Sequence, residues 1–173
     1  MQLLTTNLLL RTVEGSDLIE VMRMWNFGGE PISREEAQAA VEKMKRRHLQ
    51  NKPGSIHHLC LAVFEKNSNR IIGWCGLDGE TMGKLHIFFL IDEAYRNRGY
   101  ATQCASKLLD YAFTEAMVDG VDGGCEQDNQ ASLKVMQKVG FVITGYEDNG
   151  DPRLYITAEQ YRSLTMRKRL CCL

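Results

Sequence analysis

The hydrophobic positions of the chain change their spacing several times, and each change predicts a new element. NLLLRTV, residues 7–13, begins as a short strand. Residues 18–25 follow with apolar positions at helical spacing, and Asp17 can cap that helix. Ser33 and Glu36 then form a capping box ahead of a long helix that has acidic residues early and basic residues late, as the helix dipole prefers.

The middle of the chain has the shorter period of strands. Residues 59–66, 70–80 and 84–92 are rich in apolar residues and are separated by turn signals. We therefore expect three strands that form an antiparallel meander. From Gly99 the apolar spacing returns to that of a helix with one buried face, over residues 100–112.

The last third of the chain continues this alternation. GVDGGCEQ, residues 120–127, predicts a weak strand, and residues 129–139 predict a short helix that ends at Gly140. Residues 141–148 and 152–157 are typical of a closing pair of strands. A terminal helix can follow.

The order of these elements predicts one α/β domain with a mixed sheet over residues 1–173. About residues 164–173 are expected to form a frayed tail. The apolar start of the chain is too short and too interrupted for a membrane span.

Charge and cysteine content narrow the functional classes. Twenty-one basic and twenty-two acidic residues leave a net charge of -1, so we expect neither nucleic acid nor a membrane as partner. The six cysteines have no metal-ligand spacing and follow no secretory signal, which favours free thiols in the cytoplasm. His48, His57 and His58 have no ligand partners at suitable spacing, so no metal is expected.

Candidate chemistry is concentrated where the third meander strand gives way to a helix, at EAYRNRGYATQ, residues 93–103. A glycine-containing loop at such a junction leaves backbone N–H groups unpaired at the positive end of the helix, which favours phosphate. Gly99 lets a ligand approach, and Arg96 and Arg98 raise the local potential. The pattern is neither G-x-G-x-x-G nor a P-loop.

Arg96-x-x-Gly99-x-Ala101 resembles the Q/R-x-x-G-x-G/A signature of the GNAT superfamily of N-acetyltransferases. This resemblance implies a twisted, mostly antiparallel mixed sheet of about six to seven strands flanked by helices on both faces. It also implies acetyl-CoA as co-substrate and an amine as acceptor.

A second pattern, Asn129-x-x-Ser132 followed by Lys138-x-Gly140-Phe141, resembles that of the GNAT subgroup that includes the N-terminal acetyltransferases of ribosomal proteins. Both ends of the chain are similar to the ends of that subgroup, so the resemblance covers most of the sequence.

The resemblance also implies which residues hold acetyl-CoA. In the family, the pantetheine arm pairs with the free edge of the strand ahead of the signature, and the pyrophosphate lies on the loop after it. The expected cofactor-binding residues are Phe89, Leu90, Ile91, Arg96, Asn97, Arg98, Gly99, Tyr100, Ala101, Thr102, Asn129 and Ser132.

The catalytic groups are less well defined. Many relatives place a tyrosine seven residues after the asparagine to protonate the thiolate, and here that position is Met136, most simply a core residue. Ser132 or water can assist the leaving group instead. Relatives often carry a glutamate as the base that removes the amine proton, and its position aligns with His86 here. The His86 imidazole can accept a proton at neutral pH. Glu126 is a second candidate for the base.

These observations predict a cytoplasmic acetyl-CoA-dependent N-acetyltransferase in which a primary amine attacks the thioester directly in a ternary complex. The acceptor is either a protein N-terminus or a small-molecule amine, and the protein is a monomer or homodimer. Residues 26–32 are shorter than the loop that usually lines the acceptor site in the family, which leaves the acceptor open. Two alternatives remain: a non-catalytic CoA-binding sensor, and an α/β interaction domain in which residues 96–101 only turn the chain.

Overall fold

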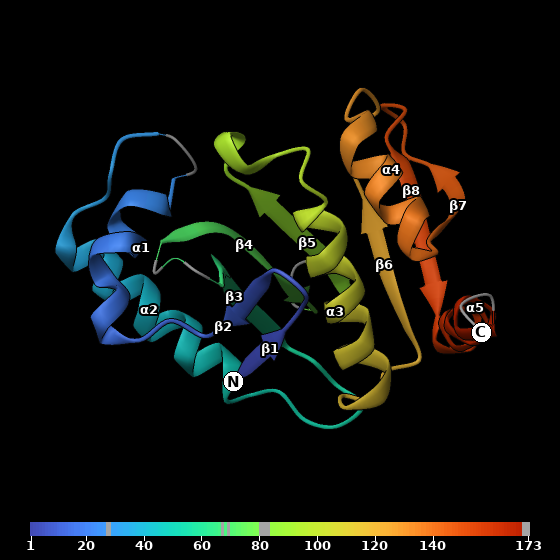
Figure 1. The fold of residues 1–173 in the computed structure, drawn as a ribbon, viewed down its shortest axis with the longest axis horizontal. Helices are drawn as coiled ribbons and strands as arrows, with labels where there is room; N and C mark the ends of the chain where they lie inside the picture. The colour runs from blue at the N-terminus through green and yellow to red at the C-terminus, as the bar shows by residue number, and fades with distance from the viewer. Residues whose placement is uncertain (27–28, 67, 69, 80–83, 171–173) are drawn as a thin grey trace.

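An eight-stranded open sheet with helices on both faces makes up the fold (Figure 1). This computed structural model describes residues 1–26, 29–66, 68, 70–79 and 84–170, with side chains described as far as residue 167. The strands are β1 (Gln2–Leu4), β2 (Leu8–Arg11), β3 (His58–Glu65), β4 (Ile71–Asp78), β5 (His86–Ile91), β6 (Gly120–Gly124), β7 (Val142–Tyr146) and β8 (Pro152–Thr157). The helices are α1 (Leu18–Met24), α2 (Arg34–His48), α3 (Tyr100–Thr114), α4 (Gln130–Val139) and α5 (Ala158–Leu170), with short 3-10 turns η1 (Gly15–Asp17) and η2 (Glu93–Tyr95).

The sheet has the strand order β1-β2-β3-β4-β5-β6-β8-β7. All neighbours pair antiparallel except β5 and β6, which are parallel. The mixed, mostly antiparallel sheet predicted from the sequence is therefore confirmed, as is the meander of β3, β4 and β5.

The parallel neighbours β5 and β6 touch at one end only. His86 lies opposite Asp122, and the Asp122 amide donates to the Leu85 carbonyl at 2.7 Å. No further pair joins the two strands, and they diverge toward the top of Figure 1. The backbone edge of β5 beyond His86 thus lacks a strand partner.

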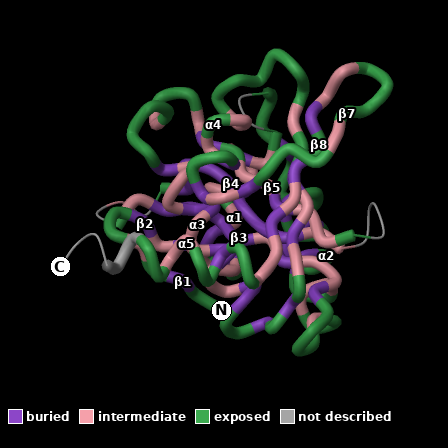
Figure 2. The backbone as a smooth tube through the Cα atoms, turned by 90° about the vertical axis from the view of Figure 1, so that its right-hand side faces the viewer, coloured by how far each residue is buried: buried purple, intermediate pink, exposed green. Residues whose placement is uncertain are grey.

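Each face of the meander packs against its own helices, because successive side chains of a strand point to opposite faces. On one face, Phe64 and Trp74 pack with buried residues of α1 and α2. On the other, Leu61 and Cys75 pack with Leu108 and further residues of α3. Figure 2 shows buried segments along β3, β4 and β5, whereas most of β7 is exposed.

Local signals explain several helix boundaries. The Ser33 side chain accepts from the Glu36 amide at 3.2 Å and the Glu36 carboxylate accepts from the Ser33 amide at 2.8 Å, so the predicted capping box is confirmed. Gly140 ends α4 in the left-handed conformation, with φ of 112°, as predicted.

Asp17 precedes α1 but does not cap it with its side chain, so that part of the sequence prediction was wrong. Its carboxylate instead accepts two hydrogen bonds from the Arg11 guanidinium, at 2.6 and 2.8 Å, and one from the Glu14 amide at 2.8 Å. A cation paired with both oxygens competes successfully with the helix end for this carboxylate.

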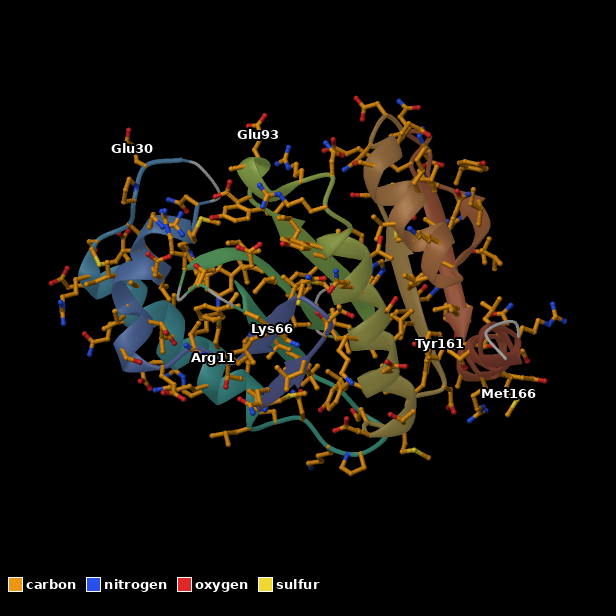
Figure 3. All side chains as sticks on the ribbon, viewed as in Figure 1. Arg11, Glu30, Lys66, Glu93, Tyr161 and Met166 are labelled. Atoms are coloured by element: carbon orange, nitrogen blue, oxygen red, sulfur yellow. The ribbon has the colours of Figure 1, made fainter. Side chains whose placement is uncertain are left out.

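One element differs from the sequence prediction. β1 was not predicted, and it raises the number of strands to eight. The terminal helix that the sequence allowed is α5, which includes residues 164–170 of the segment expected to fray; residues 171–173 lie outside the described part of the chain. The Tyr161 hydroxyl, labelled in Figure 3, ties α5 to α3 by donating to the Asp110 carboxylate at 2.6 Å.

Candidate active site

The divergence of β5 and β6 opens a cleft of about 700 Å³, here called the β5–β6 cleft. Its lining comes from the end of β5, from the loop and first turn of α3, and from the first half of α4. All the residues predicted to hold acetyl-CoA line it except Arg98. These are Phe89, Leu90, Ile91, Arg96, Asn97, Gly99, Tyr100, Ala101, Thr102, Asn129 and Ser132.

The loop before α3 presents bare backbone to this cleft. Gly99 is the N-cap of α3 with φ of 75°, and Asn97 also has a positive φ, of 62°. The first helical hydrogen bond runs from the Gln103 amide to the Gly99 carbonyl, at 3.1 Å. Within the described part of the chain, no acceptor is bonded to the backbone N–H groups of residues 98–102. Unpaired N–H groups at a helix N-terminus favour an anion.

The two arginines of the loop lie differently. The Arg96 Nε donates to the Ile91 carbonyl at 3.1 Å, which fixes the stem of this side chain at the cleft. Arg98 turns aside, because its guanidinium lies 5.2 Å from the centre of the Tyr95 ring and 3.9 Å from the Glu65 carboxylate. The Arg98 side chain therefore stabilises the loop, with a further hydrogen bond from its guanidinium to the Ala94 carbonyl at 3.2 Å.

Asn129 and Ser132 face this loop from the start of α4. The Asn129 Oδ1 accepts from the Ser132 amide at 3.1 Å, which makes Asn129 the N-cap of α4. This capping bond by itself accounts for the Asn-x-x-Ser spacing of Asn129 and Ser132, so the spacing does not require a ligand. Among the described residues, the Asn129 NH2 group and the Ser132 hydroxyl have no protein hydrogen-bond partner at the cleft.

A second cavity, of about 470 Å³, lies on the opposite face of the sheet, between α2 and the meander; we call it the α2 pocket. Its apolar walls are formed mainly by Trp25, Met44, Trp74, Phe88, Phe89 and Leu90. Lys43, Arg47 and His58 provide its basic groups. Phe89 and Leu90 line both cavities, so the two meet at the free edge of β5.

The acetyltransferase (GNAT) domain model matches residues 7–142 of the chain. That segment is most of the chain and contains both β5 and the loop before α3. The chain belongs to the GNAT acetyltransferase family.

One curated relative of this GNAT chain is the uncharacterized N-acetyltransferase YjdG of Bacillus subtilis, 28% identical over 97 residues, which are 55% of this chain and 58% of the relative. The chain spans about half the length of the curated relatives it matches.

Solved structures show the same fold over nearly the whole chain. The ribosomal-protein-S5-alanine acetyltransferase of Vibrio fischeri has a TM-score of 0.74 at 17% identity, covering 93% of this chain and 98% of that one. A spermidine/spermine N-acetyltransferase of Vibrio cholerae has a TM-score of 0.68 at 19% identity, covering 93% and 99%.

The residues predicted to perform catalysis are not all brought together in this GNAT fold. Ser132 lines the β5–β6 cleft, whereas His86 and Glu126 do not. His86 lies where β5 and β6 pair, between Asp78 and Asp122, and Glu126 is exposed ahead of α4.

Met136 is a core residue, as predicted, with 1% of its surface exposed. It packs so closely against β6 that a Cβ added at Gly123 would lie 2.8 Å from the Met136 sulfur. The side chain at this position therefore does not reach the cleft.

Sequence reasoning did not assign several side chains that line the two cavities. Tyr95 and Lys134 line the β5–β6 cleft, and His58 lines the α2 pocket. The His58 Nδ1 is 3.7 Å from the Asp78 carboxylate, and the ring stacks on Phe88 with 6.3 Å between centres. Burial, and then the charge of Arg47, lower the pKa of His58 below 6.5. Nothing in the sequence indicates that the partly buried His58 imidazole, which follows a polar loop, would line this cavity.

Within the described residues, no group of three or more metal-ligating side chains comes together. No helix in that part of the chain is both long and apolar enough to cross a bilayer.

Proposed function

We propose that this chain transfers an acetyl group from acetyl-CoA to a primary amine by direct attack in a ternary complex. The observation that supports this most is the β5–β6 cleft, which has unpaired backbone N–H groups at one end and an unpaired strand edge along one wall. The cleft meets a second cavity at Leu90 and Phe89, so two ligands can approach the same strand edge from opposite faces.

Each part of the cleft suits one part of acetyl-CoA. The N–H groups of residues 98–102 and the N-terminus of α3 would bind the pyrophosphate. The backbone of residues 89–91 would pair with the amide groups of the pantetheine arm, in the manner of an added strand. Asn129 and Ser132 would contact the arm or the sulfur from the other wall.

The reaction requires the amine nitrogen to bond to the thioester carbon while the carbon–sulfur bond breaks. The amine must lose a proton and the thiolate must gain one. The Ser132 hydroxyl, or water, would assist the departing sulfur, because Met136 is buried and cannot donate a proton.

Two imidazoles are candidates for removal of the amine proton. His86 is the candidate from the sequence, on β5 itself. His58 is favoured by geometry, because it lines the cavity that shares Phe89 and Leu90 with the cleft, and its lowered pKa keeps it neutral near pH 7. The identity of the amine decides how much help is needed: at pH 7.4, neutralising a lysine amine costs about 4 kcal/mol and an α-amine about 0.5 kcal/mol.

The setting we infer for this reaction is the cytoplasm. Cys60, Cys75, Cys104 and Cys125 are free thiols, and these are the described cysteines. Free thiols persist in a reducing compartment.

Thermal unfolding with and without acetyl-CoA tests the proposal. Ligand at about 100 times its dissociation constant stabilises the native state by about 2.7 kcal/mol, which raises the midpoint by about 5 to 11 °C for a chain of this size. Adenosine 3′,5′-bisphosphate, which lacks the pantetheine arm, should give a smaller rise at the same concentration. Amine-dependent release of CoA thiol then completes the test.

The outcomes separate the three readings of the chain. Stabilisation with amine-dependent thiol release supports the transferase. Stabilisation with no thiol release for any amine supports the CoA-binding sensor. An unchanged midpoint at saturating acetyl-CoA would overturn both, and residues 96–101 would be only a turn.

A further inference from the structure

A row of titratable side chains crosses the sheet at one level. His58 of β3 lies opposite Asp78 of β4, and Asp78 lies opposite His86 of β5. His86 in turn lies opposite Asp122 of β6. Directly opposed residues place their side chains on the same face, with Cβ atoms about 4.5–5.5 Å apart in antiparallel pairs. Two imidazoles and two carboxylates therefore alternate along one face of the sheet.

This row lies on the face of the sheet that holds the α2 pocket. Phe88 and Leu90 follow His86 by two and four residues, so they share its face, and both line that pocket. Of the four side chains in the row, His58 lines the α2 pocket, and the other three line neither that pocket nor the β5–β6 cleft. An amine in the pocket can thus reach the row at His58.

The backbone and ring plane of His58 are fixed by its neighbours. The Asn51 side chain donates to the His58 carbonyl at 3.0 Å and accepts from the His58 amide at 3.0 Å. The ring stacks on Phe88, with 22° between the two planes. The His58 Nδ1, however, is buried and has no hydrogen-bond partner among the described residues. A buried polar atom without a partner is costly, which makes its nearest polar neighbour important.

The Asp78 carboxylate is the charged group that this nitrogen faces. Its Oδ1 lies 3.7 Å from the His58 Nδ1, and the two side chains are 12% exposed for His58 and 22% exposed for Asp78. This distance is too long for a hydrogen bond, but it is only about 1 Å longer than a charge-assisted one. Hydrogen bonds that serve catalysis are often long in a ligand-free enzyme and shorten in the complex. A small rotation of either side chain would close the gap.

We propose that Asp78 is the positioning residue for His58 and thereby makes His58 the base that removes the amine proton. This inference rests on the proposed function. A hydrogen bond from Nδ1 to the Asp78 carboxylate would keep the proton of the neutral imidazole on Nδ1, which leaves Nε2 as the acceptor. The carboxylate would also stabilise the imidazolium that forms.

The proposed step moves one proton. The ammonium form of the acceptor gives this proton to the His58 Nε2, and the amine nitrogen keeps the electron pair with which it attacks the thioester carbon. The Nδ1 proton stays on His58, and Asp78 stays ionised throughout. The imidazolium then releases its extra proton to water.

Charged groups on three sides act on this imidazole. Burial lowers the pKa of His58, and the Arg47 guanidinium on α2 lowers it further, as does His57. Asp78 raises that pKa. Lys43, also on α2, lines the same pocket and has the same sign of charge as Arg47. Asp78 is therefore the group that favours the imidazolium, and loss of its charge should lower the pKa of His58 further below 6.5.

His86 approaches the same carboxylate from β5, but its place differs from that of His58. It lies between Asp78 and Asp122, and the Asp122 carboxylate is 3.7 Å from the Lys84 ammonium group. Because His86 lines neither the α2 pocket nor the β5–β6 cleft, an amine in the pocket cannot give it a proton directly. Asp122 is a matched control for Asp78, since it is the other carboxylate of the row.

Nitrogen-15 NMR of the ligand-free protein tests the pair without any turnover. The chain has four histidines, and the resonances of His58 are those lost in His58→Gln. We expect the neutral His58 imidazole to be the Nδ1–H tautomer in the wild-type protein. Asp78→Asn should lower the pKa of His58 and populate the Nε2–H tautomer, whereas Asp122→Asn should leave both unchanged. An Nε2–H tautomer in the wild-type protein, or equal effects of the two Asn variants on His58, would overturn the proposal.

Kinetics separate a positioning role from a purely structural one. With acetyl-CoA and either spermidine or an alanine-initiated peptide as acceptor, Asp78→Asn should lower kcat about 10- to 100-fold, a part of the about 10²- to 10⁴-fold that a general base contributes. Its acid limb should move to lower pH, and the KM for acetyl-CoA should stay unchanged. Asp78→Glu keeps the carboxylate and should recover most of the loss. The unfolding midpoint of each variant checks that the fold is retained.

The outcomes distinguish this inference from the proposed function. If the wild-type protein releases thiol but the acid limb does not move in Asp78→Asn, the inference fails alone. If acetyl-CoA does not bind to the wild-type protein, the proposed function fails, and the role of His58 as base fails with it. The NMR result decides in either case whether Asp78 sets the tautomer of His58.

Discussion

Replacement of Gly99 by valine tests the proposed phosphate-binding role of the loop before α3, with little risk to the fold. Gly99 has φ of 75° and ψ of 9°, a left-handed conformation that a β-branched residue rarely adopts. A Cβ at this position would meet nothing within 4 Å, so no clash within the protein is added to the backbone strain. The strain costs about 1–2 kcal/mol, which lowers the unfolding midpoint by about 2 to 8 °C.

The effect on acetyl-CoA binding should be larger than the effect on stability. Gly99 lines the β5–β6 cleft, so the open space around its Cα is the space in which a phosphate would contact the N–H groups of residues 98–102. The valine side chain would hold the phosphate away from them. Loss of one hydrogen bond to a charged group costs about 1.5–3 kcal/mol, so affinity should fall about 10- to 150-fold.

Gly54→Val is the matched control. Gly54 has φ of 78°, and a Cβ there also meets nothing within 4 Å. It lines another cavity, which shares no described lining residue with the β5–β6 cleft. Calorimetric titration with acetyl-CoA should show weaker binding for Gly99→Val and wild-type binding for Gly54→Val, at similar losses of stability. Wild-type affinity in Gly99→Val would refute the phosphate assignment.

Three further predictions concern single side chains. If His58 is the base, His58→Gln should remove the acid limb of the pH–rate profile, and His86→Gln should retain it. That limb should lie below pH 6.5, because the pKa of His58 is lowered. The reverse result for the two variants would make His86 the base. Asp17→Asn should lower the unfolding midpoint by about 3 to 12 °C, because it breaks charged hydrogen bonds worth about 1.5–3 kcal/mol. Burial raises the pKa of Asp17, but the hydrogen bonds from Arg11 and the Glu14 amide outweigh burial and hold that pKa below 3.8. The stability of the wild-type protein should therefore fall as the pH drops below 3.8. An Asp17→Asn variant that lost stability equally over this pH range would contradict the assignment. Met136→Tyr should lose about 1–3 kcal/mol by overpacking and gain no activity, and faster thiol release would show that position 136 reaches the sulfur.

Elements with strong local signals were predicted correctly from the sequence. The capping box at Ser33 and the left-handed Gly140 depend on a few neighbouring residues, so a short pattern is enough. β1 was missed because a strand of three residues has almost no periodicity, and it exists through its pairing with β2. Asp17 was misassigned because Arg11, on the preceding strand, competes for its carboxylate.

The two halves of the candidate site, the β5–β6 cleft and the α2 pocket, also differ in how far a local sequence pattern can indicate them. The backbone of residues 96–102 and the cap at Asn129 are local features, and a motif can indicate them. The α2 pocket is assembled from Trp25, which directly follows α1, and from residues of α2, β3, β4 and β5. In the sequence, Lys43 and Arg47 are only two of the basic residues late in a long helix, and the packing of α2 over the meander places them at a cavity.

The free edge of β5 explains why the β5–β6 cleft and the α2 pocket share lining residues without a channel through the sheet. Leu90 lies opposite Trp74, which packs with α1 and α2, whereas Phe89 packs against the core on the α3 face. Neighbouring residues thus point to opposite faces, and a paired strand would keep those faces apart. Because β5 pairs with β6 only at His86, both faces are open at the same edge. Under the proposed function, we therefore expect an amine over one face and a thioester over the other to meet beside Leu90.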